Sequence, residues 1–422
     1  MELYSILVGV YMAVYFHRHL ETVVNRISKR KPIIVLTGAR QVGKSTMLKT
    51  FLNQVNYIAL DRPLIRESAL NEPSLFFEKY KPPVIIDEIQ KAAGLFEYIK
   101  VYADTDKKKG QFYLSGSQSL TLMKNISESL AGRAGVIKML GFSMRELDAL
   151  EYSEPFLPLP KHIAGISKSA PVFSFETTVN RIQKGFYPEL HETESDLHDW
   201  SDFYSSYMQT YIEKDIRDVL QIQDESAFIK FVRMTAALTG QMLNLSAIAD
   251  SCGKDINTIR RWLSVMESSG LVYLLKPYSN NLNKRLIKTP KIYFLDTGLA
   301  CWLLGWNTPQ QLISGAMWGN IFESFVVAEI LKSYFNDGIT EAPLYYYRDK
   351  DKYEIDMIIQ NGNTLYPVEI KATGNPNKSM ISSFTRLDTI PGIKRGNGAV
   401  ICMANEVLPL TKNDSIIPVN YI

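Results

Sequence analysis

Cysteine is scarce in this chain of 422 residues, which has only Cys252, Cys301 and Cys402. The three are far apart and form no C-x-x-C pair, so we expect neither a zinc site nor a disulfide framework. Widely spaced single cysteines are typical of buried thiols in a reducing compartment. We therefore expect a cytoplasmic protein.

The chain also lacks a segment suited to crossing a membrane. The apolar stretch 3–16, LYSILVGVYMAVYF, is shorter than the roughly 18 residues that a span requires. It has no basic residues before it and no clear small-residue cleavage site, which argues against a secretory signal. We expect no membrane partner. Met12 is an alternative start, after which 15–27, YFHRHLETVVNRI, would open the fold as a helix with Leu20, Val23, Val24 and Ile27 at helical spacing.

A strong charge of either sign is missing too. The net charge is +3, with 22% charged and 46% hydrophobic residues, as in ordinary globular proteins. This balance neither requires nor excludes nucleic acid, because a basic patch can lie within a balanced total. A chain of this length is too long for one core, so two to four domains are expected.

The stretch 32–52, PIIVLTGARQVGKSTMLKTFL, reads as strand, loop and helix. It contains the complete Walker A pattern G-x-x-x-x-G-K-S, whose backbone N–H groups bind phosphates while Lys44 reaches the β- and γ-phosphates and Ser45 binds magnesium. The predicted ATP-binding residues here are Gly38, Ala39, Arg40, Gln41, Val42, Gly43, Lys44, Ser45 and Thr46.

A second buried strand, 84–86, ends in Asp87 and Glu88, about 50 residues after the loop begins. Ligands bind at the carboxyl ends of strands in open parallel sheets. We predict that Asp87 binds Mg²⁺ and that Glu88 polarises the attacking water. Arg133, in ESLAGRAG, either supplies a cation to the transition state, in its own chain or in a neighbouring subunit, or forms a surface ion pair.

Several motifs together resemble one group of proteins. They are LTGARQVGKST, VIIDEIQ, YLSGSQ and SLAGR, followed by GFYPEL, YMQTYIEKDI, YFLDTGLA and GNIFESFVVAEI. This set resembles the bacterial and archaeal AAA-type ATPases that carry a C-terminal domain of unknown function. The resemblance implies that Ser117 or Gln118 senses the γ-phosphate or the water.

Residues 151–180 contain four prolines and show little periodicity, so we expect an irregular connector there. From Trp200 to about Leu220 the pattern is helical, with an aromatic core stripe of Tyr204, Tyr207, Met208, Tyr211 and Ile212.

Residues 243–296 indicate a winged helix. A helix from Ser246 ends at Gly253, and a second helix places Ile256, Ile259, Leu263 and Met266 inward before Gly270. Two strands follow, joined by the basic tip NNLNKR. Residue types that contact DNA would be exposed on the second helix and the tip, namely Asn257, Thr258, Arg260, Arg261, Ser264, Lys284, Arg285 and Lys288. Winged helices also dock proteins, so both partners stay open.

The segment 354–373, EIDMIIQNGNTLYPVEIKAT, places acids in two apolar strands joined by NGN. Asp356 and Glu369 can converge at one edge, with Glu323 approaching from a helix, to bind magnesium, and Lys371 can assist the attack of water. This layout resembles the PD-(D/E)XK nuclease superfamily. Two other interpretations remain: a cross-strand salt bridge of Lys371 with Asp356 or Glu369, and a nuclease fold with a lapsed site.

The expected fold class is α/β, with a P-loop NTPase (AAA, ASCE) parallel sheet, a helical connector, a winged helix and a restriction-endonuclease-like C-terminal domain. The expected function is ATP hydrolysis with Mg²⁺, coupled to binding of double-stranded DNA and to its cleavage if the C-terminal site is active. The alternative is a nucleotide-gated protein-binding switch with a silent C-terminal domain; a homo-oligomer is left open. The expected boundaries are 1–30, 31–150, 151–228, 229–290 and 291–422.

Overall fold

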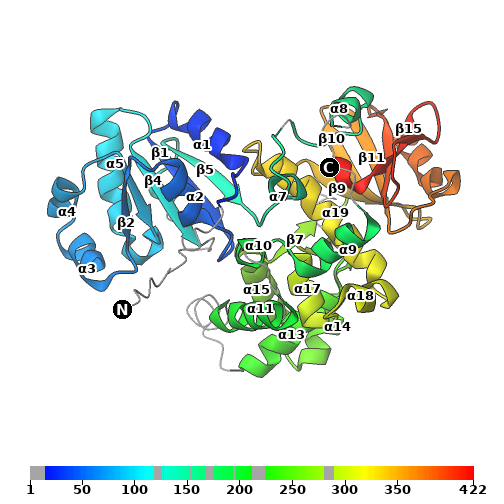
Figure 1. Ribbon diagram of the computed structural model, residues 1–422, viewed down its shortest axis with the longest axis horizontal. Helices are drawn as coiled ribbons and strands as arrows, with labels where there is room; N and C mark the ends of the chain where they lie inside the picture. The colour runs from blue at the N-terminus through cyan, green and yellow to red at the C-terminus, as the bar shows by residue number, and fades with distance from the viewer. Residues whose placement is uncertain are drawn as a thin grey trace, which may run out of the picture.

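The computed structural model describes residues 15–117, 126, 128–152, 154–166, 174–192, 196–211, 224–279 and 289–422. In Figure 1 the N-terminal sheet and its helices lie on the left, the C-terminal sheet lies at the upper right, and a group of helices lies below and between them. Among the described residues, no helix has the length and apolar character needed to cross a membrane.

The N-terminal sheet is parallel and has the strand order β2-β3-β4-β1-β5. Its central strands are continuous apolar runs because helices cover both faces. On β1, Ile34 and Leu36 face one core and Ile33 and Val35 face another, as strand alternation requires. The strands are β1 (Ile33–Gly38), β2 (Asn56–Ala59), β3 (Val84–Asp87), β4 (Phe112–Ser117) and β5 (Ala134–Met139).

Within the described ranges, the helices α1 to α5 cover this sheet. The first face packs against α1 (Leu20–Ser28) and α2 (Lys44–Phe51). The second face packs against α3 (Pro63–Asn71), α4 (Pro73–Lys79) and α5 (Leu95–Asp106). The α1 helix confirms the predicted inward positions Leu20, Val23 and Val24, which are buried. The parallel α/β sheet predicted from the apolar runs is thus confirmed.

The segment predicted as an irregular connector contains more helix than expected. It includes α8 (Pro160–Ile166) and the start of α9 (Phe175–Lys184). Pro160 misled the prediction because proline at a first helical position is compatible with a helix. Around them lie α7 (Met144–Leu147), α10 (Glu189–Glu192), α11 (Leu197–Tyr211) and α13 (Glu225–Ala237). The aromatic stripe of α11 is buried, as predicted: Tyr204, Tyr207, Met208 and Tyr211.

The next elements are α13, β6 (Gln241–Met242), α14 (Leu245–Cys252), α15 (Ile256–Ser268), β7 (Val272–Leu275) and β8 (Lys291–Phe294). The strands form an antiparallel sheet with order β6-β8-β7. Asn244 and Asp255 cap the two helices, and Gly253 between them has a left-handed φ of 62°. The predicted inward face of α15 is wrong at Ile256, which is 38% exposed, because the first turn lies beyond the packed region; Trp262 is buried instead.

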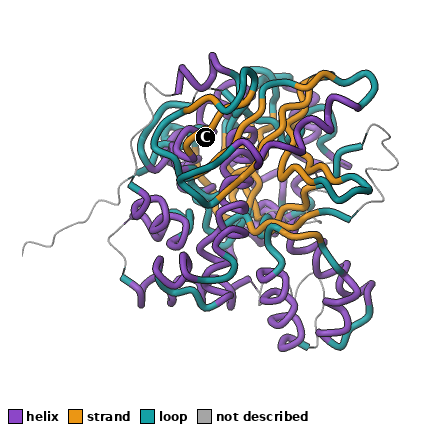
Figure 2. The backbone as a smooth tube through the Cα atoms, turned by 90° about the vertical axis from the view of Figure 1, so that its right-hand side faces the viewer, coloured by secondary structure: helices purple, strands orange, loops and turns teal. Residues whose placement is uncertain are grey.

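The C-terminal part begins with α17 (Thr297–Leu304), α18 (Pro309–Ser314) and α19 (Trp318–Phe335). A mixed sheet follows, with order β14-β15-β13-β11-β10-β9 and β12 beside β11. The predicted hairpin is confirmed, since β10 and β11 pair antiparallel. The strands are β9 (Leu344–Arg348), β10 (Glu354–Asn361), β11 (Thr364–Lys371), β12 (Lys394–Arg395), β13 (Gly398–Cys402), β14 (Leu408–Pro409) and β15 (Asp414–Pro418). Figure 2, turned by 90°, shows strands mainly in the upper half of the molecule and helices filling its lower part.

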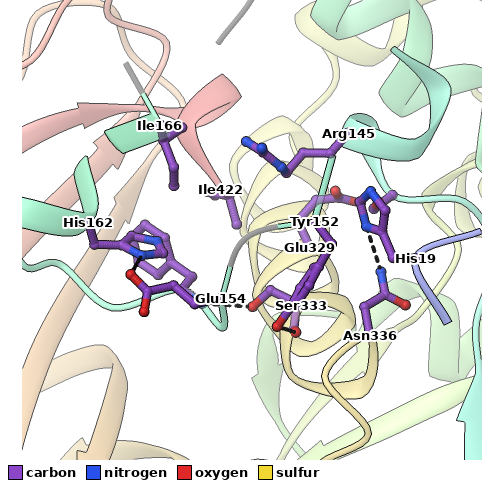
Figure 3. A pocket seen from close by; sticks show the side chains of 12 residues that line it. His19, Arg145, Tyr152, Glu154, His162, Ile166, Glu329, Ser333, Asn336 and Ile422 are labelled. Atoms are coloured by element: carbon purple, nitrogen blue, oxygen red, sulfur yellow. Dashed lines mark hydrogen bonds and ion pairs between the residues drawn. The ribbon is translucent and has the colours of Figure 1, made fainter. Parts of the chain in front are cut away.

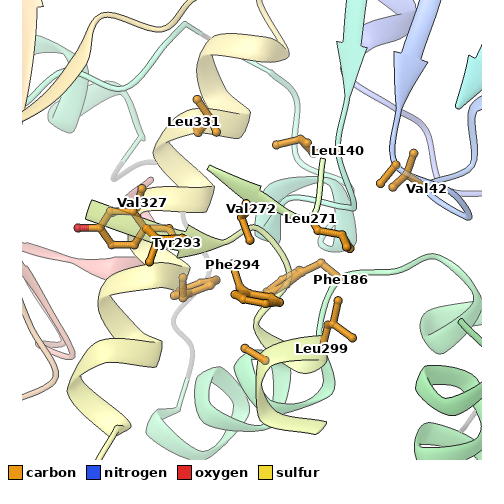
Figure 4. Close-up of a cluster of buried hydrophobic side chains, with 14 of the residues drawn as sticks. Val42, Leu140, Phe186, Leu271, Val272, Tyr293, Phe294, Leu299, Val327 and Leu331 are labelled. Carbon is orange, nitrogen blue, oxygen red and sulfur yellow. The ribbon is translucent and has the colours of Figure 1, made fainter. Parts of the chain in front are cut away.

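One hydrophobic core crosses all of these parts. Figure 4 shows Val42 and Leu140, from the N-terminal domain, facing Leu271 and Phe186, with Val327 of α19 behind them. The α19 helix is accordingly buried on most sides, with 13 of its 18 residues inaccessible, as expected of a helix enclosed by other elements. The N-terminal sheet is therefore packed against the rest of the chain rather than loosely tethered.

Polar contacts strengthen the same junction. The segment that leads into α7 lies along α19. There Glu329 accepts a hydrogen bond from Met144 N at 2.8 Å, and Lys332 donates one to Phe142 O at 2.7 Å. A small cavity of about 20 Å³ remains beside them, between His19, Arg145 and the C-terminal Ile422, and Figure 3 shows these side chains around it. This volume holds at most a water or two, so the junction is closely packed.

Candidate functional site

The loop between β1 and α2 has the backbone of a phosphate-binding loop. Gln41 and Gly43 have left-handed φ values of 59° and 89°, which curl the chain so that successive N–H groups point inward. A Cβ on Gly38 would lie 2.1 Å from Met139 O, so only glycine fits. Lys44 Nζ donates to Gly38 O and Ala39 O, at 3.1 and 2.6 Å. The lysine therefore lies within the loop, where a phosphate would replace its carbonyl partners.

Asp87, at the end of β3, is buried beside this loop. It accepts hydrogen bonds from the hydroxyls of Tyr57 and Ser115. Burial and the contact with Asp87 raise the pKa of Tyr57, while a contact with Ser45 acts in the opposite direction. Tyr57 is thus close to both predicted magnesium ligands. A hydroxyl and a carboxylate at one point are oxygen donors of the kind Mg²⁺ prefers, so Ser45 and Asp87 fit the ion that the motif implies.

Glu88 follows Asp87 with a left-handed φ of 55°, an uncommon conformation for a residue other than glycine. Its carboxylate accepts from the side-chain amide of Gln90, which also donates to Ser117 Oγ at 3.3 Å. The structure therefore links Glu88 to Ser117, the residue expected to act as a sensor. Gln118 lies outside the described residues. Gln90 has no role in the sequence prediction, although it follows within the same VIIDEIQ motif.

A cavity of about 500 Å³ opens over the phosphate loop, a size that suits a small-molecule ligand. The N-terminal domain lines it with predicted residues, namely Arg40, Gln41, Gly43, Lys44, Ser45, Thr46, Glu88 and Ser117. Its other wall comes from α10 and α11, with Pro188, Glu189, Glu192, Tyr207 and Thr210. Sequence reasoning missed this wall, because no local pattern shows that a stripe assigned to a core also borders a ligand cavity.

Arg18 is hydrogen-bonded both to the phosphate loop and to the segment that follows β5. Its guanidinium donates to Val42 O and to Leu140 O, both at 2.8 Å, and to Glu146 Oε1 at 3.0 Å. Arg18 and Glu146 are both buried, and Arg18 holds the pKa of Glu146 low despite its burial. The Arg18–Glu146 pair therefore connects the phosphate loop to α7. The sequence prediction missed it, because the two residues are 128 positions apart.

Arg133 does not reach the phosphate loop of its own chain. It directly precedes β5, and the register pairs Ala134 with Ile33 at the amino end of β1 and Met139 with Gly38 at the carboxyl end. Arg133 therefore lies at the opposite sheet edge, about 15–20 Å away along the strands. There it forms a surface ion pair with Asp104, at 2.5 and 2.8 Å. The within-chain role is wrong; a role toward a neighbouring subunit stays a prediction.

The C-terminal acids do come together, but lysines separate them. Lys371 Nζ lies 3.2 Å from Asp356 Oδ2 and 2.7 Å from Glu369 Oε1. Lys291 Nζ, from β8, lies 3.2 Å from Glu323 Oε1, 2.6 Å from Glu354 Oε1 and 3.9 Å from Asp356 Oδ1. Throughout the described part of the chain, no group of three His, Cys, Asp or Glu side chains has a geometry able to hold a metal ion.

Burial is the main influence on the ionisation of these acids. Burial, followed by the charge of Asp356, raises the pKa of Glu323 to about 7 and that of Glu369 to about 8. Burial alone would lower the pKa of Lys291, but Glu323, Asp356 and Glu354 together raise it. The cluster therefore balances its charge with ammonium groups and protons, and the carboxylates in their present arrangement do not fit the divalent ion expected from the nuclease resemblance.

The predicted nucleic-acid residues on α15 are accessible. Asn257, Arg260, Arg261 and Ser264 are exposed, while Thr258 is half-buried and bonded to the capping Asp255. Lys284, Arg285 and Lys288 lie outside the described residues.

Comparison with known proteins supports the N-terminal assignment. Residues 30–148 match the family model of an AAA domain. Residues 176–310 and 318–422 match two domains of unknown function, DUF8612 and DUF4143. Uncharacterized proteins of Mycobacterium bovis and Mycobacterium tuberculosis share 27% identity over 365 residues, which is 86% of this chain and 76% of theirs.

Among solved structures, the Walker-type ATPase of Pyrococcus abyssi aligns with a TM-score of 0.45 and 17% identity, over 68% of this chain and 96% of that one. AMPPCP-bound DnaA from Aquifex aeolicus aligns with a TM-score of 0.27 and 11% identity, over 59% of this chain and 85% of that one.

The phosphate loop, the parallel sheet and the Asp87–Glu88 pair are those of a P-loop nucleotide-binding protein. The family match defines the class further: the chain contains an AAA-type ATPase domain, followed at its C-terminus by the DUF4143 domain of unknown function. This agrees with the family resemblance found in the sequence.

Proposed function

We propose that this protein is a magnesium-dependent ATPase whose nucleotide cycle acts on bound duplex DNA. The observation that carries the proposal is the cavity over the phosphate loop, into which Lys44, Ser45, Glu88 and Ser117 all project. A nucleoside triphosphate is the ligand whose charge and length suit these four side chains.

The chain's own residues divide the work. Backbone N–H groups of 38–45 bind the phosphate oxygens, and Lys44 exchanges the carbonyls of Gly38 and Ala39 for the β- and γ-phosphates. Ser45 and Asp87 hold the magnesium ion, which neutralises charge that develops on the phosphates. Glu88 orients a water in line with the γ-phosphorus and accepts its proton. Ser117, linked to Glu88 through Gln90, senses the γ-phosphate.

Binding of DNA is proposed for the middle part of the chain. The succession α13-β6-α14-α15-β7-β8 and the sheet order β6-β8-β7 support a winged helix with α15 as recognition helix. Arg260 and Arg261 lie exposed on α15 and supply phosphate contacts. The α10–α11 wall of the nucleotide cavity contacts this part of the chain, since the Tyr211 hydroxyl at the end of α11 and Ser269 Oγ after α15 share a hydrogen bond of 3.1 Å. A change at the γ-phosphate is therefore transmitted directly to it.

Phosphodiester cleavage is not part of this proposal. Lys291 Nζ lies within 4 Å of two of the three acids that would have to bind a metal, Glu323 and Asp356. Lys371 is paired with the third, Glu369. We therefore propose that the C-terminal domain keeps the nuclease-like fold suggested by its sequence pattern but not the metal-dependent cleavage.

The decisive experiment measures ATP affinity and turnover with Mg²⁺, with and without duplex DNA, in wild type, Lys44→Ala and Glu88→Gln. Lys44→Ala should weaken ATP binding at least about tenfold, and Glu88→Gln should keep binding while turnover falls about 10²–10⁴-fold. Lys100→Ala, an exposed lysine paired with Glu97 on α5, is the matched control. Wild-type turnover in Lys44→Ala overturns the ATPase assignment.

The DNA arm of the same experiment separates the two candidate partners. Stimulation of turnover by duplex DNA supports the proposal. Retained turnover without any DNA response favours the protein-docking switch, which the exposed face of α15 also suits.

A further inference from the structure

The side chain of Lys291 is the least expected feature of the C-terminal acids. It is only 3% exposed, and lysine is almost never buried to this degree without anionic partners. Its strand, β8, is the centre of the three-stranded sheet, so this lysine comes from outside the sheet that carries Asp356 and Glu369. Sequence motifs for a nuclease centre do not include it.

The placement of Lys291 follows from strand alternation. Lys291 and Tyr293 are two residues apart on β8 and share one face. Both reach Glu323 Oε1, the lysine at 3.2 Å and the tyrosine hydroxyl at 2.7 Å. The same ammonium contacts Glu354 at 2.6 Å. One cation thus bridges α19 to β10 from a third element, at the position where oxygen ligands converge.

The remaining acids are held in the same way. Asp356 Oδ2 accepts from Ile370 N at 2.9 Å and from Lys371 at 3.2 Å, which leaves its other oxygen toward Lys291. Arg348 lies 3.5 Å from Glu354 Oε2. The acids Glu323, Glu354, Asp356 and Glu369 therefore face three cations, and the difference is a single negative charge. A divalent ion would overcompensate this charge.

Glu369 is paired through one of its two carboxylate oxygens. Its Oε1 lies 2.7 Å from Lys371 Nζ, while Oε2 is buried and has no hydrogen-bond partner among the described residues. Each of the four acids thus has at least one cation beside it. The cluster is therefore complete without a metal, and an incoming divalent ion would meet the repulsion of a fixed ammonium.

We propose that the ammonium of Lys291 is the resident cation of this acid cluster, and that it excludes divalent metal from the predicted nuclease-like centre. The cluster then acts as an ion-pair junction that fixes β8, and with it the middle part of the chain, to α19 and the C-terminal sheet. The inference does not rest on ATP hydrolysis, because it concerns a separate set of residues.

The test counts bound Mn²⁺ by the electron paramagnetic resonance of the free ion, on the full chain without nucleotide. Wild type and Asp356→Asn should bind equally, because the cluster takes no metal in either. Lys291→Met, which removes the ammonium but keeps most of the side-chain volume, should gain one site at least about tenfold tighter than any in wild type. That new site should disappear in Lys291→Met/Asp356→Asn.

Lys332→Met is the matched control, since Lys332 is also a buried lysine paired with an acid, Glu329 of α19, but lies outside the cluster. It should gain no site. A wild-type Mn²⁺ site that Asp356→Asn removes overturns the proposal, as does a folded Lys291→Met that gains none. If Lys291→Met fails to fold, the comparison of wild type with Asp356→Asn still decides. Any Mn²⁺ bound at Ser45 and Asp87 contributes equally in all variants, so it does not affect the differences between them.

Discussion

The side-chain amide of Gln90 donates a hydrogen bond to the carboxylate of Glu88. The same nitrogen donates to Ser117 Oγ at 3.3 Å, so Gln90 connects the proposed base to the end of β4. Only the nitrogen of the amide can donate to a carboxylate, so the amide is oriented with its nitrogen toward the acid, while Gln90 Oε1 is buried and unpaired among the described residues. Glu88 is thereby held in one orientation before a water is in place.

Replacing Gln90 by leucine should therefore lower kcat about tenfold and leave the affinity for ATP unchanged. Gln90 does not line the phosphate cavity, so its loss affects the orientation of Glu88 and not the binding of the nucleotide. Steady-state kinetics together with equilibrium binding of a non-hydrolysable analogue separate these quantities. Gln111→Leu, at the amino end of β4 with a contact to Lys109 O, is the control. A parallel fall in affinity and kcat would show that Gln90 acts on the loop instead.

The sequence was sufficient where local pattern decides structure. Apolar runs that end in glycine or acid predicted β1 and β3, and the Walker spacing predicted the loop, because both depend on neighbouring residues. Arg133 was mistaken because its position depends on the parallel register of β5 with β1, which no local pattern records. Lys291 was not found because its partners lie on α19 and β10, and only the packing of three distant elements brings them together.

Arg18 gives a test of the support beneath the phosphate loop. Arg18→Met removes one partner of a buried pair and leaves Glu146 uncompensated, so the free energy of unfolding should fall by about 3–5 kcal/mol. Urea denaturation measures this. Arg26→Met breaks an exposed pair with Asp337 at 3.5 Å and should cost at most about 1 kcal/mol. If the free energy of unfolding fell equally in the two variants, the buried Arg18–Glu146 pair would contribute no more stability than an exposed ion pair. ATP affinity should also fall in Arg18→Met alone, because Val42 O loses its donor.

Arg260 and Arg261 give a test of the DNA interface. Each arginine that contacts a phosphate releases counterions, so Arg260→Ala and Arg261→Ala should each reduce the slope of log affinity against log salt by about 0.9. Fluorescence anisotropy with a labelled duplex, over a series of salt concentrations, measures the slope. Arg233→Ala, exposed on α13, should leave it unchanged. An identical slope in all three variants would place the DNA elsewhere or favour a protein partner for α15.

Glu369 should make the protein less stable as pH rises. Its pKa is raised from the ordinary value of 4.5 to about 8, chiefly by burial and then by Asp356. Between these two values the folded state holds a proton that the unfolded state has lost, so unfolding releases it and stability falls with increasing pH. The full contribution is present below about pH 4.5 and is lost as pH passes through 8. Its size is on the order of 3 kcal/mol, after allowance for the partners that share the charge.

Glu369→Gln keeps the shape of the protonated acid and still accepts from Lys371, but it cannot ionise. The variant should match wild type near pH 5 and exceed its stability above pH 8, as measured by urea denaturation across this range. Glu341→Gln, at an exposed position, should follow the wild-type curve throughout. If Glu369→Gln were instead less stable at every pH, the carboxylate would be ionised in the folded protein and its second oxygen would need a cation. Since Lys371 contacts only Oε1, such a result would favour a metal ion beside Glu369 Oε2.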